Sequence, residues 1–347
     1  MHSKEIAKLA GVSRSTVSRV VNNYANVTPE TKEKVERIIK EYGYVPHASA
    51  QVLAGKISKI IGVFITNIRP GDEDFRVFRN VYVSPFEAAI IDYADKLGYN
   101  ALILIINNND DFKKIRKLFN SKILSGGIFL GANNNSKEIF DIIESGYKIA
   151  IIDQEKIEEK KINSHIIVNS DNYNGAYKAI KHLIDYGHKG IAHICGDMNK
   201  YSGFKRLEGY KKAMNEAKLK IKEDYVVYGD FTEDSGFKCV NQLFKKGSKN
   251  QITAIFSSND TMAIGAMKAL KKINLKIPKD ISIVGYDDIK IASYVSPALT
   301  TVRSPILEIA SVVTSNLINF IENNNNPDGY YTVPAELIIR ESTKKIK

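Results

Sequence analysis

From residue 59 onward the chain alternates short apolar runs with helical stretches, and this alternation constrains the fold more than any other feature. The first series contains KIIGVFIT, NALILII, GGIFLGA and KIAIID, and the second leads from HIIVNS through GIAHIC, YVVYGDF and AIFSSND to DISIVGYDD. Strands that alternate with helices form βαβ units and mainly parallel sheets. Two such series predict two doubly wound lobes in tandem, with a ligand cleft beyond the carboxyl ends of the strands.

The first 45 residues follow a different pattern, that of three short helices. SKEIAKLAG places Ile6, Leu9 and Ala10 on one side and ends at Gly11, a favourable residue for terminating a helix. The third helix begins at Thr28 and carries an apolar side formed by Val35, Ile38, Ile39 and Tyr42. Two helices joined by a tight turn, with a supporting third, predict a helix-turn-helix unit.

The second helix lies in VSRSTVSRVVNN and has two contrasting sides. With Ser13 as N-cap, the spacing predicts one buried stripe, formed by Val17, Val20, Val21 and Tyr24. The other side carries Arg14, Ser15, Ser18, Arg19 and Asn22, and no acidic residue occurs between Glu5 and Glu30. A solvated helix of a small α-domain is the alternative, but a face with this composition suits a polyanion.

A helix of this kind fits the major groove of B-DNA, where residues near its N-terminus reach base edges. Arg14 and Ser15 are placed for base contacts, and Arg19 suits two-pronged recognition of guanine. Hydroxyl groups near the same end are candidate phosphate donors, and these belong to Ser3, Ser13, Thr16 and Ser18.

Charge and composition agree with an acidic partner without locating it. The formal net charge of the 347-residue chain is +11. Residues 1–58 carry +4 of this charge, and the remainder is spread over a Lys- and Asn-rich chain in which genomic composition bias is an alternative explanation. No membrane span and no apolar signal segment is visible, so we expect a cytoplasmic protein. Cys195 and Cys239 fit buried core positions in a reducing compartment.

Several long motifs carry a resemblance to a known family. KEIAKLAGVSRSTVSRVVNN and the segment from VTPETKEKVERIIKEYGY to ASAQVLAG resemble the DNA-binding headpiece and hinge of the lac repressor/galactose repressor (LacI/GalR) family. The likeness continues through RLEGY, SSNDTMAIGAMKAL, IPKDISIVGYDDI, ALTTVRSP and LIIREST, so it covers nearly the whole chain. It implies a periplasmic-binding-protein-like core of two α/β lobes behind the headpiece.

The resemblance assigns the segment after Pro46 to a hinge helix that folds on operator DNA. Leu53 matches the family leucine that enters the minor groove and kinks the DNA, and His47 falls in the same DNA-contacting region. Without the family context, Leu53 reads as an ordinary linker residue. Gln51 and Val52 stand where many relatives carry an arginine, so fewer phosphate contacts are expected.

The resemblance also implies an effector site between the lobes. Arg206 matches the arginine that binds effector hydroxyls or carboxylates, a task that suits its five-donor fork. The other implied effector-binding residues are Phe86, Asp153, Ser170, Phe231, Asn259, Asp287 and Ser304. Taken alone, Phe231 reads as a core residue and Asp171 as a turn residue, and Asp260 beside Asn259 is a further polar candidate.

Three departures from the family bear on ligand specificity. Gln154 stands where many relatives have an arginine, and Ser304 where some sugar-binding members have glutamine. Residues 67–86 contain an insertion rich in arginine and aromatic residues at the expected mouth of the cleft. This insertion reshapes specificity or, equally, decorates the surface.

Motifs for catalysis and metal binding are absent from the sequence. It contains no dinucleotide-binding glycine motif after a strand, no Walker A motif and no G-x-S-x-G, and its six histidines show no paired metal spacing. His188 suits a structural role between a helix and a strand. We therefore expect no enzyme activity, no metal and no cofactor apart from a small effector.

Together these observations predict a homodimeric transcriptional repressor that binds a pseudo-palindromic operator in double-stranded DNA under control of a small ligand, with a sugar as the family's commoner effector. The expected domains are the headpiece at 1–45, the hinge at 46–58 and the core at 59–347. Within the core we expect an N-lobe of about 59–163 plus 292–322 and a C-lobe of about 164–291 plus 323–343. A stand-alone sugar receptor and an α/β hydrolase are the alternatives.

Overall fold

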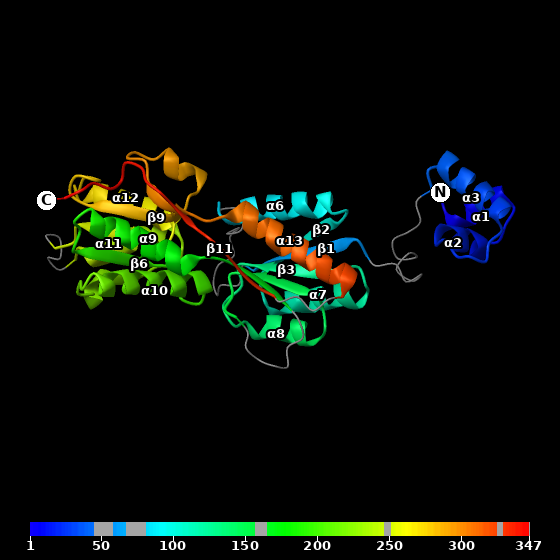
Figure 1. The fold of residues 1–347 in the computed structure, drawn as a ribbon, viewed down its shortest axis with the longest axis horizontal. Coiled ribbons are helices and arrows are strands. Elements are labelled where there is room, and N and C mark those ends of the chain that lie inside the picture. The colour runs from blue at the N-terminus through cyan, green and yellow to red at the C-terminus, as the bar shows by residue number, and fades with distance from the viewer. Residues whose placement is uncertain (45–57, 67–80, 157–164, 246–250, 325–328, 347) are drawn as a thin grey trace. The chain divides into compact units, whose positions relative to one another are not determined.

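The computed structural model describes residues 1–44, 58–66, 81–156, 165–245, 251–324 and 329–346. These residues form a small helical N-terminal part and a much larger α/β core (Figure 1). No helix among them is long and apolar enough to cross a membrane.

The N-terminal part contains α1 (Ser3–Ala10), α2 (Arg14–Val21) and α3 (Pro29–Glu41). Its small core includes Ile6, Val17, Val20 and Val35. Gly11 follows α1 with a φ of 62°, a left-handed conformation that glycine adopts without a steric cost. Three helices around one apolar cluster confirm the predicted helix-turn-helix unit.

The core contains two six-stranded sheets, one in each lobe. The N-lobe sheet has the order β11-β5-β4-β3-β1-β2 and the C-lobe sheet β12-β10-β9-β8-β6-β7. The N-lobe strands are β1 (Ile60–Thr66), β2 (Asn100–Ile106), β3 (Gly126–Leu130), β4 (Ile149–Ile152), β5 (Ile166–Ser170) and β11 (Tyr330–Val333). The C-lobe strands are β6 (Ile191–Cys195), β7 (Val226–Tyr228), β8 (Ala254–Ser257), β9 (Ser282–Asp287), β10 (Thr300–Arg303) and β12 (Glu336–Ile338).

Helices cover both faces of each sheet (Figure 1). In the N-lobe, α6 (Val83–Lys96) and α13 (Ile306–Asn323) lie on one face, with α7 (Asn109–Asn120) and α8 (Lys137–Glu144) on the other. In the C-lobe, α9 (Asn172–Asp185) and α10 (Tyr201–Glu216) share one face, opposite α11 (Glu233–Leu243) and α12 (Asp260–Lys272). Short 3-10 turns occur at Glu223–Tyr225 and Lys290–Ser293.

Buried strands supply both faces of the C-lobe core by alternation. Ile191 and Cys195 pack toward α9 and α10, whereas Ala192 and Ile194 pack toward α11 and α12. The strand pairs are mainly parallel, with β12 antiparallel to β10. The predicted pair of doubly wound lobes is therefore confirmed.

The lobe boundaries require a correction, because the chain crosses between the lobes at different points from those predicted. The strand in HIIVNS pairs with β4 and β11 and so belongs to the N-lobe, although the predicted N-lobe ended near residue 163. Strand β10 belongs to the C-lobe and β11 to the N-lobe, which reverses the predicted assignment of both segments. An apolar run indicates a strand but carries no information on which neighbour that strand pairs with.

Candidate functional sites

Helix α2 presents a polar face that contains no acidic residue. Ser13 caps the helix through a hydrogen bond from the Thr16 amide at 3.1 Å, so its hydroxyl serves the backbone. Arg14, Ser15 and Arg19 are exposed beyond this cap. The arrangement matches the expected base-contacting face.

Ser3 and Asn22 lie at the two ends of this face. The Arg14 guanidinium donates from Nε to the Ser3 hydroxyl at 3.1 Å, which places the start of α1 beside the start of α2. Asn22 donates from its amide to the Ser18 carbonyl oxygen at 2.9 Å and closes the last turn. Arg19 has no such partner in the described residues, so its charge faces solvent.

Two positions of the predicted apolar stripes are wrong. Tyr24, at 52% exposure, and Tyr42, at 45%, lie outside the core. Each follows its helix, where the chain leaves the helical path, so helical spacing no longer determines which way the side chain points. Leu9 is likewise exposed, and Ala7 takes the buried place between Ile6 and Ala10. His47 and Leu53, with most of the hinge, lie outside the described residues.

In the core, polar side chains follow the carboxyl ends of the strands in both lobes. Asp153 follows β4, and Ser170 ends β5. From the C-lobe, Asp287 ends β9, and Asn259 caps α12 directly after β8. The two sets meet where the backbone amide of Ser202 donates to Asp153 Oδ2 at 3.3 Å. This is the edge at which parallel sheets place their ligands.

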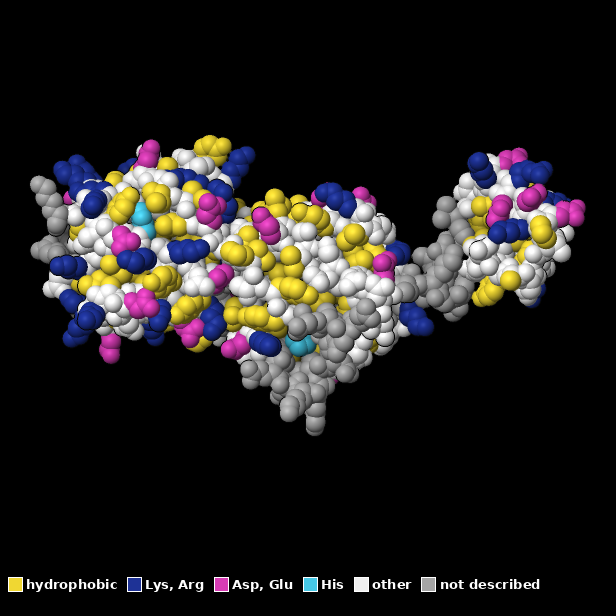
Figure 2. Space-filling model, viewed as in Figure 1, with side chains coloured by type: hydrophobic (Ala, Val, Ile, Leu, Met, Phe, Trp, Pro, Cys, Tyr) yellow, Lys and Arg dark blue, Asp and Glu magenta, His cyan; other side chains and the backbone are white. Residues whose placement is uncertain are grey.

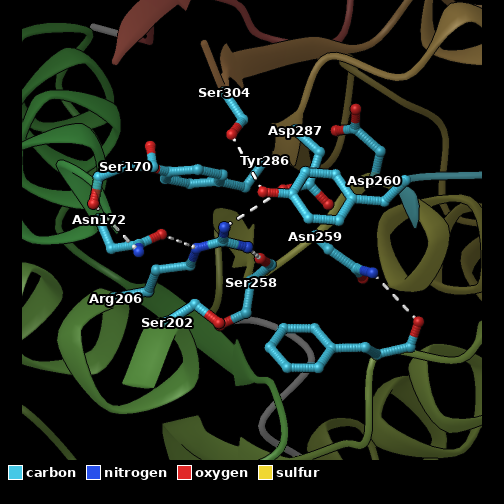
Figure 3. A network of polar contacts seen from close by, with 12 residues as sticks. Ser170, Asn172, Ser202, Arg206, Ser258, Asn259, Asp260, Tyr286, Asp287 and Ser304 are labelled. Atoms are coloured by element: carbon cyan, nitrogen blue, oxygen red, sulfur yellow. Dashed lines mark hydrogen bonds and ion pairs between the residues drawn. The ribbon is translucent and has the colours of Figure 1, made fainter. Parts of the chain in front are cut away.

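Arg206 occupies the centre of this cluster and is 3% exposed (Figure 3). Its Nε donates to Asn172 Oδ1 at 2.9 Å, and its Nη2 lies 3.2 Å from Asp287 Oδ1. Nη1 donates to the carbonyl oxygen of Ser258. The Tyr286 ring covers the guanidinium, with 3.6 Å between Cζ and the ring centroid. The fork is therefore held rigid and keeps N–H groups to spare for a ligand.

The carboxylates around Arg206 resist ionisation. Burial raises the pKa of Asp287 to about 7, although the neighbouring Arg206 charge lowers it. Burial also raises the pKa of Asp153. The pKa of Asp260 is raised well above its usual value by burial and by the nearby Asp287 charge. Asp260 accepts hydrogen bonds from Thr301 Oγ1 and the Ile289 amide, so it supports the site from behind.

The raised pKa of Asp287 gives a testable dependence of stability on pH. Because the folded state keeps this proton to a higher pH than the unfolded state, the free energy of unfolding falls as pH rises from about 4 to 7. We expect the Asp287→Asn variant to lose less stability over this range than the unsubstituted protein, as measured by urea unfolding at each pH. Parallel pH profiles for the two proteins would contradict the assignment.

Sequence reasoning missed Tyr82, which precedes α6 at the end of the predicted insertion. Its hydroxyl lies 3.1 Å from Ser304 Oγ, and burial raises its pKa. Phe86, expected to contact the effector, is fully buried in the N-lobe core with its ring edge on Tyr82 at 5.2 Å between centroids. The structure thus places Tyr82 at the cleft and Phe86 behind it. The aromatic content of the insertion was the one available signal.

Phe231 and Asn259 are positioned by each other. Asn259 accepts from the Met262 amide at 2.9 Å as the cap of α12 and donates to the Phe231 carbonyl oxygen at 3.0 Å. Phe231 has a φ of 70°, and its ring lies against Gly196, where a Cβ atom would overlap it. Ser170 Oγ is buried and has no hydrogen-bond partner among the described residues. Asp171 caps α9 through the Asn174 amide, as its alternative structural reading predicted.

The other singled-out residues occupy structural positions. Cys195 and Cys239 are free and buried, as predicted. His188 bonds Thr253 Oγ1 at 3.0 Å and the Lys344 carbonyl oxygen at 3.1 Å. Within the described ranges, no group of three or more His, Cys, Asp or Glu side chains is placed to hold a metal ion.

Two family models match the chain. The model described as bacterial regulatory proteins, lacI family, matches residues 4–47, and that of a periplasmic binding protein-like domain matches residues 180–343. The HTH-type transcriptional repressor PurR of Haemophilus influenzae (strain PittEE) is 32% identical over 353 residues, covering 99% of this chain and 98% of that protein. Catabolite control protein A of Priestia megaterium is 32% identical over 343 residues, covering 98% of each.

Solved structures give the same result for the whole chain. The Lac repressor dimer bound to operator and the anti-inducer ONPF superposes with a TM-score of 0.81 at 27% identity, covering 99% of each chain. The complex of the transcriptional regulator CelR with cellobiose gives a TM-score of 0.75 at 25% identity, also covering 99% of each.

Proposed function

This chain belongs to the LacI family of bacterial regulatory proteins, and from that membership we propose that it is a cytoplasmic, homodimeric repressor of transcription whose operator affinity is set by a small neutral effector. It binds double-stranded DNA through α2 and the effector through the Arg206 cluster, without a catalytic step and without any other cofactor. The single observation that carries the proposal is the exposed, acid-free face of α2, which is joined in one chain to a two-lobed core with a buried polar cluster.

The headpiece supports DNA binding through rigid presentation of its polar residues. The Ser13 cap and the buried Val17 and Val20 fix the rotation of α2, so Arg14 and Arg19 project from the same exposed side. A side chain without an internal partner, such as Arg19, keeps both prongs of its guanidinium for a base edge or a phosphate.

The Arg19→Ala variant tests this interface. Operator sequences would first be selected from a random DNA library with the full-length protein, and affinities then measured over a range of salt concentrations. A bidentate base contact accounts for about 1–3 kcal/mol, so we expect the operator affinity to fall by roughly 5- to 150-fold, with a smaller change on unrelated DNA. Arg37→Ala, an exposed arginine on α3, serves as the matched control.

Equal losses for Arg19→Ala and Arg37→Ala would show that the headpiece contributes charge without a defined reading face. If the full-length protein selected no DNA sequence at all, the repressor function itself would be contradicted.

The core supports a neutral, hydroxyl-rich effector. Around the Arg206 cation lie Asp153 and Asp287, so the cluster holds no excess positive charge for an anionic ligand. Amide and hydroxyl groups from Asn172 and Ser170 add partners for neutral hydroxyls, which such sites select strongly because a missing partner leaves a buried group unsatisfied. The similar CelR structure is a cellobiose complex, which supports a sugar.

Exposed apolar side chains support a second copy as the partner of the core. Ile91 on α6, Leu97 just beyond it, and Leu102 and Ile103 on β2 are all exposed large hydrophobic residues. Strand β2 is an edge strand of the N-lobe sheet. On the face shown in Figure 2, charged side chains of both signs are interspersed over the C-lobe, and hydrophobic ones gather over the N-lobe. An exposed apolar edge of this kind is suited to a symmetric dimer, and the similar Lac repressor is a dimer.

A further inference from the structure

A second cavity opens beside the Arg206 cluster. Its volume is about 490 Å³, which falls within the range of small-molecule sites. The N-lobe contributes the loop 131–136 after β3 and the start of α7, and the C-lobe contributes Met198, Asn199 and Lys200 between β6 and α10. Both lobes therefore form its walls, as they do for the Arg206 cluster.

The walls of this side cavity are held in place without a ligand. The buried Gln154 amide donates to the Asn133 carbonyl oxygen at 2.7 Å and accepts from the Asn135 amide at 3.0 Å. Lys200 Nζ reaches across from the other lobe to Asn133 Oδ1 at 2.8 Å and to the Gly131 carbonyl oxygen at 2.5 Å. Gln154, where relatives carry an arginine, thus fixes the asparagine loop.

The lining favours neutral hydroxyl groups over ions. Asparagine amides dominate it, and the side chains of Asn109 and Asn135 have no hydrogen-bond partner among the described residues. Lys200 is already engaged, and Glu138 accepts from the Ser136 hydroxyl at 2.9 Å. Phe112 adds an apolar surface. Free amides beside an aromatic side chain suit a sugar ring, which has hydroxyl groups around an apolar face.

The side cavity adjoins the Arg206 cluster through two shared segments. Gln154 directly follows Asp153, so consecutive residues after β4 serve the two sites. Lys200 immediately precedes α10, and Arg206 lies six residues further on, about 9 Å along a helix that rises about 1.5 Å per residue. A ligand anchored at Arg206 and longer than one sugar ring would enter the side cavity.

We infer that the effector is a neutral disaccharide or larger saccharide, with one unit at the Arg206 cluster and the next unit in the side cavity against Asn109 and Asn135. This inference rests on the proposed effector function. It adds that this chain discriminates by ligand length through the asparagine loop that Gln154 fixes.

Titration calorimetry with the full-length protein tests the inference. The probes are glucose with maltose, cellobiose and trehalose, and galactose with lactose and melibiose. We expect at least one disaccharide to bind at least tenfold more tightly than its component monosaccharides. Asn109→Trp, which fills the cavity from an exposed position, should weaken that disaccharide at least tenfold and leave the monosaccharides within twofold. Asn215→Trp, at an exposed asparagine on α10 that does not line this cavity, is the matched control.

A second variant guards against misfolding of the tryptophan substitution. Asn135 has a φ of 58°, so Asn135→Gly removes the amide and keeps the backbone comfortable. It should selectively weaken the same disaccharide. Equal affinity for monosaccharides and disaccharides, indifference to both cavity variants, or no binding of any of these saccharides would overturn the inference. The repressor function is decided separately by the DNA selection, so the two failures are distinguishable.

Discussion

Replacing Arg206 with methionine should destabilise the core by about 3–5 kcal/mol at pH 8, the cost of removing one partner of a buried ion pair. Asp287 would remain 6% exposed with no cation beside it. Its pKa, already near 7, would rise further, so the carboxyl group would hold its proton and the loss of stability would be smaller at pH 5. Urea unfolding of the full-length protein at both pH values measures this difference.

The double variant Arg206→Met/Asp287→Asn separates stability from ligand recognition. Removing both charges should restore most of the lost stability, because no unpaired charge stays buried. Affinity for a saccharide that binds the unsubstituted protein should still fall by about 10- to 100-fold, the effect of losing one hydrogen bond to a charged donor. Restored binding in the double variant would show that Arg206 supports the fold without contacting the ligand.

The sequence predicted the elements of the core well because their signals are local. Buried strands such as β3, with all five residues buried, read as continuous apolar runs, and the caps Ser13, Thr28 and Asp171 stand where the helices begin. Asp153 and Arg206, expected in one cleft through the family resemblance, do lie in the same cluster.

What the sequence did not predict depends on long-range pairing. The three crossings between the lobes place Ser170, Ser304 and β11 in an order that local periodicity does not encode. The role of Gln154 depends on an asparagine loop about twenty residues earlier in the chain, and that of Tyr82 on a hydroxyl group 222 residues later. Each of these contacts requires the folded lobes to bring the partners together.

Replacing Gly175 with alanine should impair the Arg206 cluster without touching the ligand. Gly175 lies in α9, and a Cβ atom there would sit 3.0 Å from Cε2 and Cζ of Tyr286 and closer still to its hydroxyl oxygen. The ring cannot retreat, because it is fully buried and its other face lies on the Arg206 guanidinium. Overpacking of this kind costs about 1–3 kcal/mol, against a gain of about 1 kcal/mol in helix propensity. We expect lower stability and weaker saccharide binding.

Tyr286→Phe provides the compensating change, since it removes the atom nearest to the added methyl group. The lost hydroxyl group donates one long hydrogen bond, 3.4 Å to the Asp171 carbonyl oxygen, so the single variant should lose little. In Gly175→Ala/Tyr286→Phe the ring can return to the guanidinium, and both stability and saccharide affinity should recover beyond the sum of the single effects. Additive losses in this double-mutant cycle would show that Gly175 matters to α9 alone. Recovery would establish that the ring of Tyr286 positions Arg206, and that a glycine on the far side of that ring tunes the effector site.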